Sequence, residues 1–211
     1  GMKRLRGILT GLQATFREDG EIDRDSMASQ VKHCIEAGSH ALVFPISNGE
    51  FQYLSEQERT SLVETIAETA SNQVPVVIGV TAPSLWQATQ MARHAKELGV
   101  DAVIASPPYV EGPTGPELRR YYQGISETAE MPVVVEHTWP GMSIAFVAGL
   151  IRDVANILYV KEETPQEDER PTDHSLTNVL QAVGQGCLGV FGSDDGCFMI
   201  ADMRRGVSGF I

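Results

Sequence analysis

The chain has little cysteine, little positive charge and no long apolar run. Cys34, Cys187 and Cys197 are an odd number and lack the spacing of metal ligands. We interpret them as reduced core thiols, which are typical of a cytoplasmic protein. No apolar run reaches the roughly 18 residues of a membrane-spanning helix. With 28 Asp and Glu against 16 Lys and Arg, the net charge is −12. Because this charge repels nucleic acid and anionic lipid, we expect neither nucleic acid nor a membrane as a partner.

Short β-branched runs alternate with longer amphipathic stretches along all 211 residues. Strands are predicted at residues 8–15, 41–44, 76–79, 102–105, 133–135, 157–160, 188–191 and 207–211. Helices are predicted at residues 24–37, 55–71, 84–98, 116–129, 143–153 and 175–183. Most of the strands are apolar on both faces, which favours a parallel sheet covered by helices.

An internal repeat gives the spacing of the predicted strands and helices along the chain. Residues 36–43 recur 61 positions later as residues 97–104, and a degenerate third copy occupies residues 205–211. In each copy a glycine is expected to end a helix in the left-handed conformation before a buried strand. Eight strands are enough to close a (β/α)8 TIM barrel, so we predict one such domain over residues 1–211. A doubly wound open sheet is the alternative, and we expect the native protein to continue beyond the last strand.

Lys161 is the sharpest functional candidate, because it follows the apolar run 157–160 where a barrel strand reaches the mouth. Desolvation there would lower the pKa of the amine and free its lone pair for attack on a ketone. The product would be a Schiff base, an electron sink for making or breaking a neighbouring bond. The alternative is a structural lysine that reaches solvent or pairs with Glu162 or Glu163.

Two further segments carry polar groups at strand ends. The turn at Ser47, Asn48 and Gly49 offers a hydroxyl, an amide and backbone N–H groups to a small carboxylate, or it merely serves the following helix. Glu136 and His137 are adjacent, so only one can face the pocket from an extended strand, and either could act as general acid or base.

A specific combination of motifs runs through residues 16–23, 47–50, 54–59, 107–109, 159–162 and 206–211. In these motifs the chain resembles the dihydrodipicolinate synthase and N-acetylneuraminate lyase family. The resemblance implies a TIM-barrel class I aldolase without a cofactor, a homo-oligomer (dimer or tetramer), acting on pyruvate or a related 2-oxo acid.

The resemblance also assigns roles to particular residues. Lys161 matches the Schiff-base lysine, and Ser47 and Asn48 match the pair that holds the keto-acid carboxylate, with Asn48 in place of a threonine. Ile211 matches an apolar residue of that pocket. We place Tyr109, from the Pro107-Pro108-Tyr109 motif, with the substrate-binding residues.

The departures from the family pattern concern proton transfer and the second substrate. Counting forward from Pro132 puts Glu136 in the place of the family's catalytic tyrosine, whereas counting back from Pro140 puts His137 there. We favour Glu136. Met142 stands where dihydrodipicolinate synthase has an arginine for its second substrate, which argues against that activity. Val110 replaces a tyrosine of the relay from a neighbouring subunit.

We therefore expect a Schiff-base lyase acting on a 2-oxo acid with a sugar-acid or aromatic tail, which Trp139 could contact. One alternative is a magnesium-dependent enzyme that uses Glu136, Glu162 and Asp194 as ligands. Another is a family member that binds its ligand without turning it over.

Overall fold

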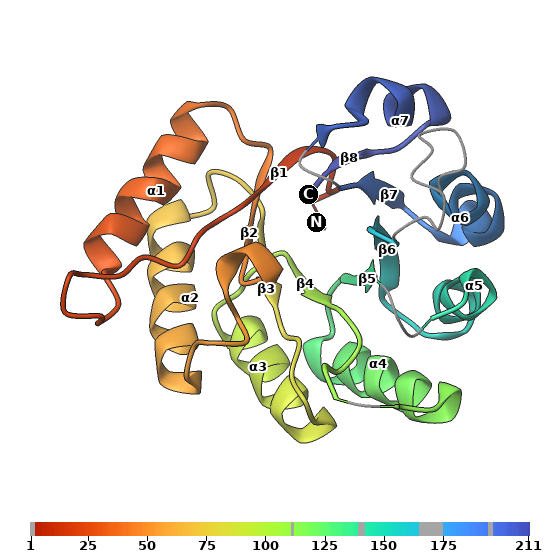
Figure 1. Cartoon of the computed structure of the whole chain (residues 1–211), viewed down its shortest axis with the longest axis horizontal. Helices are drawn as coiled ribbons and strands as arrows, with labels where there is room; N and C mark the ends of the chain where they lie inside the picture. The colour runs from red at the N-terminus through yellow and green to blue at the C-terminus, as the bar shows by residue number, and fades with distance from the viewer. Residues whose placement is uncertain (1–2, 111, 139–141, 165–174, 194–195) are drawn as a thin grey trace.

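The computed structural model is a closed barrel of eight parallel strands with helices around it (Figure 1). It describes residues 3–110, 112–138, 142–164, 175–193 and 196–211. The strands are β1 (Gly7–Gly11), β2 (Ala41–Phe44), β3 (Val76–Gly79), β4 (Ala102–Ala105), β5 (Val133–His137), β6 (Ile157–Glu162), β7 (Gly189–Gly192) and β8 (Gly209–Phe210). The helices are α1 (Arg24–Glu36), α2 (Glu56–Ala70), α3 (Leu85–Glu97), α4 (Gly115–Ala129), α5 (Ile144–Asp153), α6 (Ser175–Val183) and α7 (Met199–Arg205). Two short 3-10 turns, η1 (Ser47–Gly49) and η2 (Gly184–Gly186), also lie in the described part of the chain.

The pairing of β1 with β8 closes the sheet, since Gly7 lies opposite Gly209 in parallel register. This confirms the TIM barrel and excludes the open sheet. A Cβ atom on Gly209 would lie 1.9 Å from the carbonyl oxygen of Gly7, so the closing pair depends on glycine.

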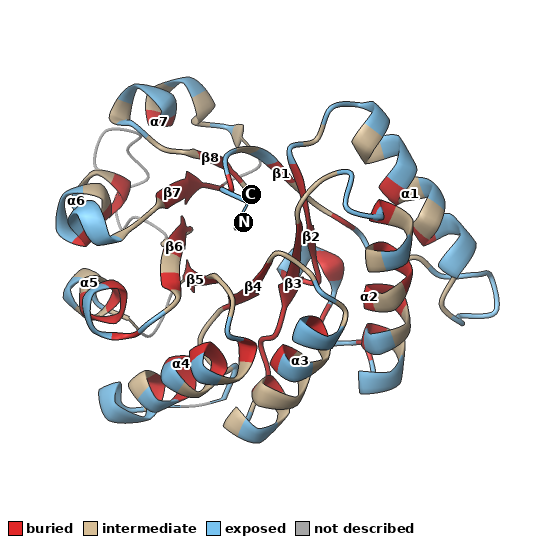
Figure 2. Ribbon diagram, turned by 180° about the vertical axis from the view of Figure 1, so that it is seen from behind, coloured by how far each residue is buried: buried red, intermediate tan, exposed pale blue. Residues whose placement is uncertain are grey.

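Two apolar layers hold the barrel together, and the period of two along each strand separates them. Side chains such as Leu9, Val43, Ile104 and Phe191 fill the interior. Sequence neighbours of Val43 and Ile104, namely Leu42, Phe44, Val103 and Ala105, pack outward against the helices. Figure 2 shows the buried strands inside a ring of helices whose outer faces are exposed. The site therefore stands on a strand framework that is packed on both sides.

The predicted helix-ending glycines adopt the left-handed conformation. Gly38, Gly99 and Gly206 have φ values of 91°, 69° and 101°. Each ends a helix before the strand that follows, as the internal repeat predicts.

The structure corrects several boundaries and one assignment. β1 ends at Gly11 rather than residue 15, while β5 and β6 extend further and take in His137 and Glu162. The helix α7 was not predicted. Cys197 is exposed, so it is not a core thiol, whereas Cys34 and Cys187 pack against the outer apolar layer. Within the described ranges, no helix has the length and apolar character to cross a membrane.

Candidate functional site

The carboxyl ends of β5 and β6 bring Glu136 and Lys161 together. The two residues are register partners in the sheet, and both side chains point into the barrel. Lys161 Nζ donates to Glu136 Oε1 at 2.6 Å and to Glu163 Oε2 at 2.6 Å. Lys161 and Glu136 are only 2% and 3% exposed. The amine is therefore enclosed in the barrel and held by two carboxylates.

The pKa of the Lys161 amine is raised, which corrects the expectation that desolvation lowers it. Burial alone would lower this pKa, but attraction by Glu136 and Glu163 outweighs the effect of burial. Lys161 is thus an ammonium in the resting site, paired with Glu163 as the alternative interpretation held. It must lose a proton before it can act as a nucleophile.

The pKa of the Glu136 carboxyl is raised as well, but by burial and not by its charged neighbour Lys161. Burial raises the pKa of its carboxyl above the ordinary value, although the neighbouring Lys161 opposes the rise. A carboxylate with a raised pKa takes up a proton more readily than an ordinary one, so Glu136 is suited to exchange protons with a bound substrate.

Two adjoining cavities open beside this cluster at the mouth of the barrel. The first has a volume of about 320 Å³ and includes Lys161 and Glu163 in its wall, together with Ser47, Asn48, Ser193 and Ile211. The second has a volume of about 280 Å³ and is lined by Ser47, Phe51, Gln52, Ser106, Glu136, Thr138 and Glu163. The paired lysine therefore has room beside it for a small substrate.

The turn η1 presents Ser47 and Asn48 to the first cavity. Both side chains are exposed at the barrel mouth, directly after the buried strand β2. Gly11 makes room for this arrangement, since a Cβ there would lie 2.5 Å from the Asn48 amide nitrogen. Ile211 adds an apolar wall to the same cavity. The structure thus gathers three of the four predicted binding residues around Lys161.

Tyr109, the fourth predicted binding residue, lies at the rim. It is 45% exposed, and its ring meets the edge of Phe51 with 5.5 Å between ring centres. It reaches the second cavity only through Phe51. Trp139 lies outside the described residues.

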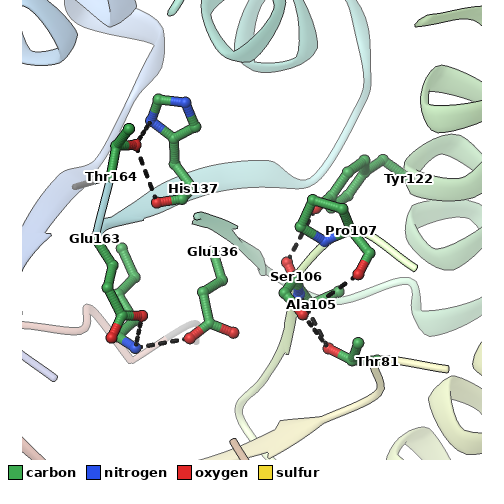
Figure 3. Close-up of polar contacts among 10 residues, drawn as sticks. Thr81, Ala105, Ser106, Pro107, Tyr122, Glu136, His137, Glu163 and Thr164 are labelled. Carbon is green, nitrogen blue, oxygen red and sulfur yellow. Dashed lines mark hydrogen bonds and ion pairs between the residues drawn. The ribbon is translucent and has the colours of Figure 1, made fainter. Parts of the chain in front are cut away.

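His137 faces away from Lys161, as Figure 3 shows for His137 and Glu136. Its Nδ1 lies 2.5 Å from Glu162 Oε2, and its Nε2 lies 2.9 Å from the backbone carbonyl of Met142. The Glu162 carboxylate also accepts from the backbone of Thr164 at 3.0 Å and from the hydroxyl of Ser175. His137 therefore contributes to a buried polar network between the sheet and the helices, and the position at Lys161 is taken by Glu136.

This network also bears on the magnesium alternative. Glu136 and Glu162 extend from opposite faces of the sheet, so they cannot share one ion. Asp194, the third suggested ligand, lies outside the described residues. Among the residues that are described, no three His, Cys, Asp or Glu side chains form a cluster that could hold a metal.

Glu163 is the site residue that the sequence reasoning missed as a functional group. It follows β6 directly, and its backbone N–H donates to the His137 carbonyl at 2.9 Å, which continues the sheet. The alternation of side chains along a strand could have identified Glu163, since a residue two positions after Lys161 lies on the same face of the sheet.

Comparison with known proteins gives a consistent result. The sequence model of the Dihydrodipicolinate synthetase family matches residues 4–211. The 4-hydroxy-tetrahydrodipicolinate synthase of Methylobacterium radiotolerans is 32% identical over 195 residues, which are 90% of this chain and 62% of that protein. The enzyme of the same name from Gluconobacter oxydans is 30% identical over 204 residues, covering 88% of this chain and 68% of that protein. This chain thus spans about two thirds of the length of these relatives.

Solved structures show the same barrel. The dihydrodipicolinate synthase of Aquifex aeolicus superposes with a TM-score of 0.87 at 23% identity, covering 98% of this chain and 69% of that one. CdNal from Clostridium difficile, solved in complex with mannosamine, gives a TM-score of 0.89 at 21% identity, covering 99% and 70%. At these identities the likeness establishes the fold.

Proposed function

Because the chain belongs to the dihydrodipicolinate synthetase family, we propose that it is a Schiff-base lyase that acts on pyruvate or a related 2-oxo acid. The observation that carries this proposal is the position of Lys161, which is 2% exposed at the end of β6 and lines a cavity of about 320 Å³. Its Nζ would attack the keto carbon and form the covalent link.

The substrate carboxylate would lie at η1 in the first cavity. The Ser47 hydroxyl and the Asn48 amide can both donate hydrogen bonds to a carboxylate. Ile211 would contact the apolar end of a small 2-oxo acid. This arrangement holds the keto carbon near Lys161, and such positioning converts an encounter into a reaction within one complex.

Glu136 would handle the proton on the carbon side of the reaction. It offers a carboxyl where the family pattern has a phenol, and the raised pKa of this carboxyl favours uptake of a proton from the bound substrate. We propose Glu136, rather than His137, as the acid–base residue because only Glu136 contacts Lys161.

The lining of the second cavity favours a substrate with a hydroxylated tail. Gln52, Ser106 and Thr138 offer neutral hydrogen-bonding groups there. Ser106 is fixed by Thr81, whose hydroxyl oxygen lies 3.0 Å from the backbone nitrogen and 3.2 Å from the hydroxyl oxygen of Ser106 (Figure 3). We propose a sugar acid ahead of the dihydrodipicolinate synthase reaction, because Met142 packs against the core where that enzyme has an arginine.

The ion pairs of Lys161 with Glu136 and Glu163 also favour one competing function. If the two carboxylates hold Lys161 as an ammonium permanently, the protein binds 2-oxo acids without turning them over. Binding of pyruvate measured by calorimetry, with no adduct trapped by borohydride and no turnover of any member of a sugar-acid panel, would identify this case.

We also propose that the chain works as a homo-oligomer in the cytoplasm. Tyr53 and Trp86 are 81% and 67% exposed, and Val110 is 47% exposed. Contact between copies would cover such side chains.

Reduction with borohydride in the presence of pyruvate tests the proposed chemistry. A Schiff base is reduced to a stable amine, so mass spectrometry should find the reduced pyruvate adduct on the peptide that contains Lys161. The Lys161→Ala variant should form no adduct while it keeps the circular dichroism spectrum of the wild type. An adduct that persists in this variant would refute the assignment.

A further inference from the structure

Two carboxylates contact one amine, yet they come from different places in the site. Glu136 belongs to β5 and Glu163 follows β6, and each has an oxygen 2.6 Å from Lys161 Nζ. A single carboxylate would be enough to pair the ammonium. The second one brings a net negative charge into a site proposed to bind an anion, so its presence calls for a role beyond pairing.

The two carboxylates differ in access to solvent. The Glu136 side chain is 4% exposed and the Glu163 side chain is 31% exposed. Glu163 lines both cavities, whereas Glu136 lines the second. A proton that reaches Glu163 can pass to water at the barrel mouth, while a proton on Glu136 is enclosed beside the substrate tail.

We infer that Glu163 is a second catalytic carboxylate, which moves the proton of Lys161 Nζ and releases the substrate oxygen as water. Glu136 then serves the carbon atoms of the substrate. The inference rests on the proposed function, and it divides the nitrogen and carbon steps of that reaction between two residues.

The nitrogen steps balance with Glu163 as the carrier. Glu163 takes one proton from the Lys161 ammonium, and the free amine forms a bond to the keto carbon while the carbonyl π electrons move to oxygen. A second nitrogen proton moves to that oxygen, which gives a neutral carbinolamine. Glu163 returns its proton to the hydroxyl, the carbon–oxygen bond breaks, and water leaves. The products are a protonated Schiff base, water and the Glu163 carboxylate.

The charges in the cluster make this carrier necessary. The two glutamates hold Lys161 in its charged form, so the amine cannot attack until a base accepts its proton. Glu163 is already in contact with Nζ, and the first cavity lies against both groups. The proton therefore has a short path from Lys161 Nζ to Glu163.

Matched glutamine variants test this division of labour with pyruvate as the probe. In Glu163→Gln the rate of adduct formation, measured by borohydride quench at successive times, should fall about 100-fold. In Glu136→Gln that rate should fall far less than in Glu163→Gln, although loss of the contact between Glu136 and Lys161 Nζ will change it. Exchange of the pyruvate methyl hydrogens with deuterium, followed by NMR, should instead fall about 100-fold in Glu136→Gln.

Two further variants separate catalysis from simple charge balance. Glu163→Asp keeps a carboxylate and should retain most of the rate. Glu163→Ala should be slow and should be rescued by added formate, which can occupy the vacated space as a base. If Glu163 served only to hold the ammonium, Glu163→Gln would ease loss of the proton and form the adduct faster than wild type at neutral pH.

The outcomes distinguish this inference from the proposed function. An adduct that forms in Glu163→Gln at or above the wild-type rate overturns the inference alone. No adduct in the wild-type chain with any 2-oxo acid overturns the proposed function, and the inference with it. Circular dichroism of each variant verifies that the barrel is folded.

Discussion

Side chains at the ends of β5 and β6 alternate between two environments. Glu136 and Lys161 point into the barrel, while His137 and Glu162 lie between the sheet and the helices. Each pair is in register across the two strands. One stretch of paired strand thus supplies the reactive cluster on one face and a buried ion pair on the other.

The buried ion pair of His137 and Glu162 should stabilise the fold only within a limited range of pH. The hydrogen bond and charge of Glu162 raise the pKa of His137 even though burial opposes this. This contribution is complete below about pH 6.5, the ordinary histidine pKa, and is lost as pH rises through the folded-state value. The lowered pKa of Glu162 acts in the opposite direction. Its contribution is present above about pH 4.3 and is lost as pH falls through the folded-state value.

We predict that His137→Gln lowers the free energy of unfolding by about 3 kcal/mol at pH 6. The loss should shrink above the raised pKa of the histidine, and urea unfolding over a pH series measures it. The variant should still form the pyruvate adduct, because His137 faces away from Lys161. His94→Gln is the control, since its ion pair with Glu64 is partly exposed and should change stability by less than about 1 kcal/mol. Equal losses in the two variants, or an adduct abolished in His137→Gln, would contradict this account.

The sequence could locate these residues but could not orient them all. Lys161 stands at the end of an apolar strand, and that position alone predicts the barrel mouth. Glu136 and His137 are adjacent, so their faces depend on the register with β6, which is a long-range property. The sign of the Lys161 pKa shift likewise depends on two glutamates whose distances only the fold determines.

At the scale of elements, η1 depends on a close approach between β2 and β3. A Cβ on Gly79 would lie 1.7 Å from the carbonyl oxygen of Pro45. Pro45 lies two residues before Ser47, so the glycine at the end of β3 allows the chain to turn into the proposed carboxylate site. The shape of the site therefore depends on a residue without a side chain at position 79.

Gly79→Ala should lower the free energy of unfolding by about 3 kcal/mol or more, because backbone atoms must move to admit the methyl group. The shift should also raise KM for the 2-oxo acid through Ser47. Thermal unfolding and steady-state kinetics measure the two effects. Gly115→Ala at the start of α4 is the matched control, since its Cβ meets no atom within 4 Å. If both variants unfold like the wild type, the close approach does not constrain the turn.

Helices and strands with a buried apolar face are predictable from the sequence pattern, whereas α7 is not. Strands β2, β3 and β4 have the predicted bounds because each is a short apolar run. In α7, Ile200 and Met203 are 71% and 62% exposed, so its apolar residues do not mark an inward face. A helix of seven residues with that pattern gives no periodic signal.

At the scale of the whole molecule, repetition made the barrel predictable. Three copies of a helix–glycine–strand unit indicate the repeating architecture, the short apolar runs give eight strands, and eight parallel strands can close. Closure itself is a contact between Gly7 and Gly209, which no local pattern encodes. The oligomeric state stays a prediction.

A crystal structure of the protein soaked with pyruvate tests the central claim most directly. We predict continuous density from Lys161 Nζ to the keto carbon, with the pyruvate carboxylate at Ser47 and Asn48 and with Glu136 beside the bound carbon atoms. Pyruvate bound elsewhere, or a Lys161 still paired with both glutamates and not bonded to the ligand, would contradict the account.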